Sequence, residues 1–286
     1  MKIKFSLLLL AVVLIVPTIT QAHGYRARVD VANWRLSMSR LECRLWQAVP
    51  TYGEAVFSYR AGDEQRFFLK SKKSIESKGE VNVESIPPSW RPRNQNRFLA
   101  SRSNDLGSMP VRFDDQLANR LLAELEDGMF PSITHGGWYD GHDITIDVSA
   151  VNFGDAYRDY VNCVADLLPA NFEQLNRSAF LFATDHYRLT PIMAKHVATI
   201  AEYVLEDSDV GHIYVDGHTD SKGRRGHNWE LSRKRGASVK DALVQAGVDE
   251  SMISMRYHGE GTPILTNKTS SNRSHNRRVV VVMDKI

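Results

Sequence analysis

The residues best suited to chemistry in this chain are a carboxylate and a guanidinium on either side of a polar, glycine-rich loop. Asp220 lies in the loop that follows an apolar strand, and Arg235 lies on the helix that follows the loop. A carboxylate and a guanidinium held facing each other suit a small ligand that carries both an ammonium and a carboxylate. Each charge-assisted hydrogen bond to such a ligand would contribute roughly 1.5–3 kcal/mol.

The position of Arg235 on its helix indicates that it faces inward. Leu231 and Val239 belong to the apolar stripe of this helix, and Arg235 lies four residues from each of them, on the same face. A guanidinium in that place cannot shed its proton and needs an anion. We expect the anion to be a ligand carboxylate; the alternative is a structural ion pair between Asp220 and Arg235.

The elements that must position this pair alternate between strand and helix. Thr190 and Pro191 begin one helix, whose apolar stripe is Met193, Val197, Ile200 and Val204. A second helix is predicted over 228–246, capped by Asn228 and stopped at Gly247. Strands are predicted at 179–182, 211–215, 253–257 and 278–283. This β-α-β-α-β-β order predicts a small sheet with helices packed on one face.

The first half of the chain has a different pattern. Residues 23–175 consist mostly of short β-type runs separated by Gly- and Pro-containing turns. Helices are predicted over 114–126, where leucines recur at helical spacing, and over 156–168. The predicted fold class is therefore α+β, with a β-rich N-terminal domain over 23–175 and a second domain over 176–286.

The first 22 residues are typical of a cleaved secretory signal. Lys2 and Lys4 precede an apolar run over 5–16, and residues 20–22 offer a small-residue cleavage site before His23. The run is shorter than the roughly 20 residues of a spanning helix; a retained anchor is the alternative. The chain has 36 Lys and Arg against 34 Asp and Glu. Loss of two lysines leaves a neutral protein, which argues against nucleic acid as main partner.

The two cysteines, Cys43 and Cys163, both follow the cleavage site. In an oxidising compartment an even pair favours a disulfide, and two unpaired buried thiols are the alternative. His135 and the turn over 138–143 suggest a metal site, but a polar turn is favoured because no third ligand is placed. We predict no metal, no cofactor and no enzyme activity, since no nucleophile motif or pair of catalytic carboxylates is present.

The segment GHTDSKGRRGHNWELSRKRGASVKDAL, together with NRRVVVV near the end, resembles the OmpA-like peptidoglycan-binding family over about 177–286. The resemblance implies that Asp220 and Arg235 hold the ammonium and carboxylate of meso-diaminopimelate in the wall's stem peptide. It also assigns other residues to the pocket or its surroundings, namely Thr219, Asn228, Leu231, Ser232, Asp185 and Arg278.

The N-terminal half is similar to the MotY family of flagellar motor proteins, on the runs RLECRLWQAVPTYGEAVFSYRA, PPSWRP, LAELEDGMFP and YVNCVADLLP. The resemblance spans nearly the whole mature chain. It implies a periplasmic protein that joins the basal body as part of the T ring, beside a MotX-like partner. Its N-terminal domain would recruit stator units while its C-terminal domain binds the wall.

Four other functions are weighed against this one. An outer-membrane porin needs about eight alternating strands with aromatic girdles, whereas residues 23–175 contain helical stretches, Pro87 and Pro88. A stator subunit needs a retained transmembrane helix, and a wall hydrolase needs a nucleophile or a metal. An OmpA-like protein that tethers the envelope to peptidoglycan without a motor role is the remaining alternative.

Overall fold

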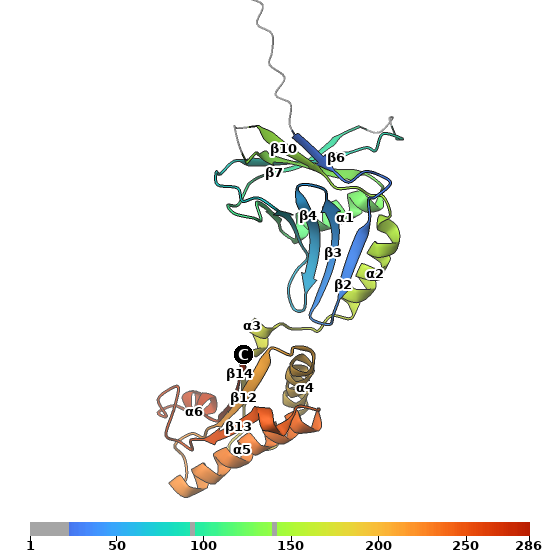
Figure 1. Cartoon of the computed structure of the whole chain (residues 1–286). Helices are drawn as coiled ribbons and strands as arrows, with labels where there is room; N and C mark the ends of the chain where they lie inside the picture. Colours follow the sequence, from blue (N-terminus) through green and yellow to red (C-terminus); the bar gives the residue numbers. More distant parts are fainter. Residues whose placement is uncertain (1–22, 92–94, 139–141) are drawn as a thin grey trace, which may run out of the picture.

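The computed structural model describes residues 23–91, 95–138 and 142–286, so the predicted signal over 1–22 lies outside the described residues. The chain builds two hydrophobic cores, drawn one above the other in Figure 1. Two sheets and two helices enclose the first core, and one four-stranded sheet with its helices encloses the second. The predicted α+β class is confirmed. Within the described residues, no helix is long and apolar enough to cross a membrane.

The first core lies between two five-stranded sheets. Strands such as β3 alternate buried and half-buried residues, as expected for a sheet with one face on a core. One sheet has the order β1 (His23–Arg26), β10 (Asp143–Asp147), β9 (Phe130–Gly136), β6 (Glu80–Ile86), β7 (Arg97–Ser103). The other has the order β2 (Trp34–Met38), β3 (Glu42–Val49), β4 (Gly53–Arg60), β5 (Arg66–Ser71), β8 (Val111–Phe113).

Two helices complete this part of the molecule. Helix α1 (Asp115–Glu126) agrees with the prediction, and the Asp114 side chain caps it by accepting from the Leu117 amide at 3.1 Å. Helix α2 (Phe153–Ala165) begins and ends three residues before the predicted range of 156–168. Its first turn forms because Phe153 packs edge-on against Trp34, with ring centroids 5.0 Å apart.

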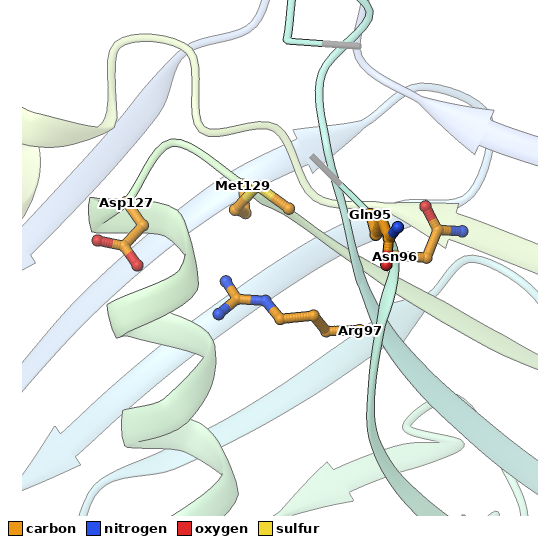
Figure 2. Close-up of a pocket in the computed structure, with 5 residues that line it drawn as sticks. All are labelled: Gln95, Asn96, Arg97, Asp127 and Met129. Atoms are coloured by element: carbon orange, nitrogen blue, oxygen red, sulfur yellow. The ribbon is translucent and has the colours of Figure 1, made fainter. Parts of the chain in front are cut away.

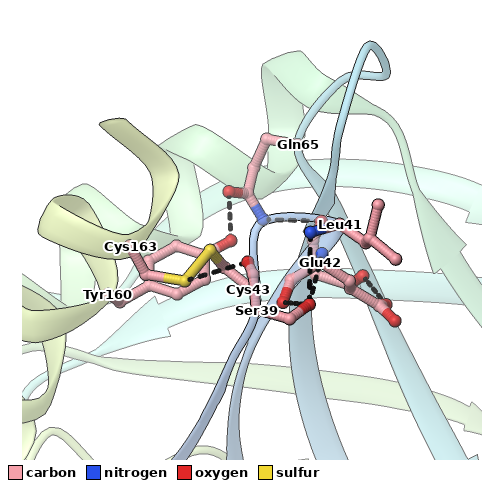
Figure 3. Close-up of a disulfide and its surroundings, with 8 residues drawn as sticks. Ser39, Leu41, Glu42, Cys43, Gln65, Tyr160 and Cys163 are labelled. Carbon is pink, nitrogen blue, oxygen red and sulfur yellow. Dashed lines mark hydrogen bonds between the residues drawn. A yellow bond between two sulfur atoms is a disulfide. The ribbon is translucent and has the colours of Figure 1, made fainter. Parts of the chain in front are cut away.

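Cys43 and Cys163 form a disulfide that joins β3 to α2 (Figure 3), so the alternative of two free thiols is wrong. Cys43 is fully buried. Beside the disulfide, the Tyr160 hydroxyl donates to Gln65 Oε1 at 2.6 Å. The bridge spans 120 residues and fastens the last long helix of the first core to a central strand.

The second core is covered by helices on one face of its sheet. The strand order is β11 (Arg177–Leu181), β14 (Arg278–Lys285), β12 (Val210–Gly217), β13 (Ile253–Tyr257), with β12 and β13 parallel and the other pairs antiparallel. Helices α4 (Pro191–Glu206) and α5 (Arg225–Gln245) pack on that face. Thr190 caps α4, and its predicted apolar stripe is buried. The short helices α3 (Phe172–Leu175) and α6 (Ser270–Asn276) were not predicted.

The predicted start of α5 is wrong. The helix begins at Arg225, with Arg224 at the N-cap position in an extended conformation, and Asn228 lies inside the first turns. Asn228 does not cap the helix because its side-chain amide donates elsewhere, to the Asp220 carbonyl at 3.3 Å and to the Glu260 carboxylate. The predicted stop is confirmed, since Gly247 follows the last turn with a φ of 105°.

We predict that the Cys43→Ala/Cys163→Ala double variant unfolds more easily than the wild type. In the chain-entropy model, a bridge that closes a loop of this length contributes up to about 5 kcal/mol. The free energy of unfolding, measured by denaturant titration, should therefore fall by about 2–5 kcal/mol. An unchanged unfolding midpoint would mean that the packing of α2 on β2 and β3 is sufficient without the bond.

Candidate ligand-binding cavity

A cavity of about 280 Å³ opens where the end of β12, the following loop and the first turns of α5 meet the segment after β11. The close approach of strand and helix depends on Gly217, because a Cβ there would lie 2.1 Å from the Ser232 carbonyl oxygen. Six of the predicted site residues line this cavity: Asp185, Thr219, Asp220, Asn228, Leu231 and Arg235. Ser232 and Arg278 do not.

Arg235 is the most deeply buried charge in the cavity wall, with no exposed surface. Its guanidinium donates to three carbonyl oxygens, those of His186 at 2.7 Å, Ala183 at 2.9 Å and His218 at 3.1 Å. Burial, and then the charge of Arg277, lower the pKa of Arg235 to about 10, so it stays protonated at neutral pH. A guanidinium has five N–H groups, which leaves two for a ligand.

Asp220 does not pair directly with Arg235. Its carboxylate accepts from Arg277 Nη1 at 3.0 Å and from the Lys222 amide at 2.9 Å, and it is 5% exposed. Across the described ranges, no ion pair joins Asp220 to Arg235. The alternative of a structural Asp220–Arg235 ion pair is therefore wrong. The two groups line one cavity and leave space between them.

Sequence reasoning missed five lining residues, and Arg277 is the one that bonds to the Asp220 carboxylate. The others are Thr184, Lys222, Gly223 and His227. Arg277 immediately precedes β14, lines the cavity, and donates through Nε to the Phe182 carbonyl at 3.0 Å. The run NRRVVVV contains two arginines, Arg277 and Arg278, and only the second was assigned to the site. That second arginine, Arg278, instead directs Nη2 to the Thr262 carbonyl at 3.3 Å.

Of the remaining predicted residues, some line the cavity and Ser232 lies behind its wall. The Thr219 hydroxyl lines the cavity and is buried without a hydrogen-bond partner among the residues that the structure describes. Asp185, at the cavity edge, places Oδ1 2.8 Å from His227 Nε2, from which the carboxylate accepts when that nitrogen carries a proton. Ser232 lies behind the lining, where its hydroxyl donates to Trp229 O and accepts from the Gly259 amide.

Two other places in the described residues are less suited to a ligand. In the described residues no group of three His, Cys, Asp or Glu could hold a metal. Residues 139–141 of the turn suspected as a metal site lie outside the described residues. Both ring nitrogens of His135 already have partners, the Tyr52 hydroxyl and the Gly136 carbonyl. An open hollow of about 590 Å³ lies beside α1 (Figure 2), but Arg97, which reaches into it, pairs with Glu124. The cavity at Asp220 and Arg235 is the stronger candidate.

His218 supports the cavity from behind. Its ring stacks on His258 with centroids 4.7 Å apart, its Nδ1 lies 2.9 Å from Thr262 Oγ1, and its carbonyl accepts from Arg235. Burial, followed by the charges of Arg278 and His258, lowers the pKa of His218 to about 4. The imidazole is therefore neutral at physiological pH.

The strand–loop–helix cavity and its sheet define the C-terminal part as an OmpA-type domain, because residues 181–277 match the model of the OmpA family. Residues 25–169 match the model described as the MotY N-terminal domain. The sodium-type flagellar protein MotY of Vibrio parahaemolyticus is 30% identical over 269 residues, covering 91% of this chain and 90% of that protein. The chain belongs to the MotY family.

Shorter relatives match the C-terminal part alone. The putative lipoprotein YfiB of Escherichia coli is 38% identical over 106 residues, which cover 37% of this chain and 66% of that protein. The peptidoglycan-associated lipoprotein of Buchnera aphidicola is 28% identical over 122 residues, covering 42% of this chain and 70% of that protein. The OmpA-type part thus occurs in proteins of different lengths.

We expect the free energy of unfolding to fall at acidic pH because His218 is held neutral in the folded protein. The unfolded imidazole takes up a proton near pH 6.5, whereas the folded one resists until about pH 4. Above pH 6.5 the imidazole is neutral in both states and does not change the free energy of unfolding. As the pH falls from 6.5 to about 4, the unfolded chain takes up a proton that the folded chain does not, and the free energy of unfolding falls by about 3 kcal/mol. Denaturant titrations at several pH values should show a shallower acid slope for His218→Gln. Parallel slopes for the two proteins would contradict the assignment.

We also predict that Arg235 stabilises the fold in addition to its role in binding a ligand. Arg235→Met removes the guanidinium donor from three carbonyl oxygens, of which the one of Ala183 keeps the His186 amide as a donor. The variant should lower the free energy of unfolding by about 3 kcal/mol. Arg233→Met on the same helix is the matched control, because the Arg233 side chain is 41% exposed and its ion pair is with Glu230 on the helix surface. Equal unfolding midpoints for the two variants would contradict this role.

Proposed function

We propose that the cavity binds the diaminopimelate of the peptidoglycan stem peptide, with its ammonium on Asp220 and its carboxylate on Arg235. The observation that carries the proposal is the placement of these two groups in one cavity without a direct bond between them. A ligand with both charges would meet an acceptor and a donor at once. The name of the peptidoglycan-associated lipoprotein, which shares this part of the chain, agrees with such a ligand.

The groups around the pair are suited to the same ligand. Arg235 keeps two N–H groups beyond its three carbonyl bonds, and a carboxylate can accept both. The Thr219 hydroxyl is buried and lacks a partner among the described residues, so a ligand atom there would satisfy it. Asp220 has lone pairs left for an ammonium beside Arg277 and the Lys222 amide.

For the whole chain we propose a periplasmic role in the flagellar motor, after cleavage of residues 1–22. Residues 23–175 would join the basal body in the T ring with a MotX-like partner, and residues 176–286 would bind the wall. The chain would thereby anchor stator units around the basal body. This role is structural and requires no catalysis and no cofactor. Its support is membership of the MotY family over nearly the whole chain.

The second candidate is an OmpA-like protein that tethers the envelope to peptidoglycan without a motor role. The shorter relatives named as lipoproteins favour it for the C-terminal part. They cover 37% and 42% of the chain, whereas the flagellar relative covers 91%. Because the additional coverage includes the MotY N-terminal domain over residues 25–169, we favour the motor role.

We predict that the purified mature protein co-sediments with peptidoglycan sacculi and that Asp220→Asn weakens binding about tenfold or more, the loss expected for one charged hydrogen bond. This variant keeps the size of the side chain and removes the charge offered to an ammonium. Free meso-diaminopimelate should displace the wild type. Asp241→Asn, on the exposed face of α5, removes the same charge outside the cavity and should bind normally.

Arg235→Lys is the partner variant, chosen over alanine so that part of the buried hydrogen bonding is kept. Its binding is interpretable only if its thermal midpoint stays near that of the wild type. Wild-type protein that stays in the supernatant, or Asp220→Asn protein that sediments as well as Asp241→Asn, would count against a diaminopimelate site.

A further inference from the structure

One face of the sheet β2-β3-β4-β5-β8 is left uncovered. Its inner face carries the apolar row Leu36, Leu45, Phe57, Phe67 and Phe113, which belongs to the first core. Both helices pack on that inner side, since α2 buries Phe153 against Trp34 and bonds its cysteine to Cys43, and the buried leucines of α1 join the same core. The opposite face of the sheet faces solvent.

The strand register places a second row across this outer face. One residue from each strand contributes to it, in the order Arg35, Trp46, Val56, Phe68 and Arg112. Val56 has no exposed surface although it lies on the solvent side, flanked by the half-buried rings of Trp46 and Phe68. The Arg44 guanidinium lies over Trp46, 5.9 Å from the ring centroid. The result is a flat apolar strip with a guanidinium at each end.

The same face is strongly basic. Its cations are Arg35, Arg44, Arg60, Arg66, Lys70 and Arg112, and its register partners include two acids, Glu42 and Glu54. Arg66 and Arg112 have exposed ion pairs, to Asp63 at 3.3 Å and Asp105 at 3.7 Å. Within the described part of the chain, no carboxylate lies within ion-pair distance of Arg35, Arg44 or Arg60. Next to the strip, a groove of about 520 Å³ includes Phe68 and Met109, and its wall carries both arginines and carboxylates, the latter from Glu42, Asp63, Glu64 and Asp114. The excess of cations therefore lies on the strip and its ends and not in this groove.

We propose that this outer face is a docking surface for an acidic protein surface. Arginine and aromatic side chains are enriched at protein interfaces, and they supply most of the binding energy where they lie at the centre. The half-buried rings of Trp46 and Phe68, which cover Val56, fit such a centre, and the surrounding cations fit an acidic rim on the partner. Opposite charge on the partner would speed its association and fix its orientation.

The probe for this surface is flagellar basal bodies purified from cells that lack this protein. Only this choice of probe rests on the proposed motor function. Mature wild-type protein should co-sediment with them. Arg35→Glu/Arg44→Glu should bind about tenfold or more weakly, because like charges would then face each other. Arg35→Lys/Arg44→Lys should retain most binding, and Trp46→Ala should lose it. Rising salt should weaken wild-type binding.

Arg26→Glu/Arg158→Glu is the matched control, with the same change in net charge at two exposed arginines outside this face. It should bind basal bodies as the wild type does. The charge variants should keep the wild-type thermal midpoint, and Trp46→Ala should have a lower midpoint but remain folded at the assay temperature. All variants should bind sacculi normally, which separates loss of docking from misfolding or loss of wall binding.

Four results would overturn the proposal. Equal binding of wild type and Arg35→Glu/Arg44→Glu would reject this face alone, whereas no wild-type binding to basal bodies would reject the motor role as well. Concentration-dependent self-association that the same variant abolishes, seen by sedimentation velocity, would identify a second copy as the occupant. Binding of the wild type to phosphatidylglycerol vesicles that the variant loses would identify a lipid surface.

Discussion

The C-terminal part of the structure is organised around one buried charge that cannot be neutralised. Arg235 has no exposed surface, and its pKa, although lowered, stays at about 10. Burying such a group is tolerated only when its donors are satisfied. Three carbonyls from two separate segments accept three of its five N–H groups, one at each nitrogen. The loop after β11 and the end of β12 are thus held against α5 by the same side chain that lines the cavity.

The charges around the cavity are divided between structure and binding. Arg277 holds the Asp220 carboxylate in place, so this acid does not collapse onto Arg235. A direct Asp220–Arg235 bond would satisfy both groups and close the space for a ligand. Because each group has its own partner instead, the cavity stays open with an acceptor and a donor in its wall. A ligand with both charges can therefore bind without breaking an existing ion pair.

Local signals in the sequence were sufficient for much of this arrangement. Thr190 and Pro191 located the start of α4, because capping depends on adjacent residues alone. Asn228 misled for the opposite reason: its side chain bonds to residues brought near by the tertiary fold. Neighbouring residues at the start of a strand point to opposite sides, so the choice between Arg277 and Arg278 required the exact start of β14. Asp220 and Arg235 were predicted, and Arg277, which binds the Asp220 carboxylate, was not.

The junction between the two cores matters for the proposed link between a motor and the wall. A flexible linker would leave the two parts free to change their relative orientation, but this junction is packed. Gly62 approaches α3 so closely that a Cβ would lie 2.3 Å from Gln174 Oε1. The Leu168 amide donates to Arg40 O, and the Arg40 guanidinium lies 3.5 Å from carboxylates of α4. Because Ala61 and Leu168 also belong to the second core, the contacts at the junction join the OmpA-type part directly to the β-rich part that contains the disulfide between β3 and α2.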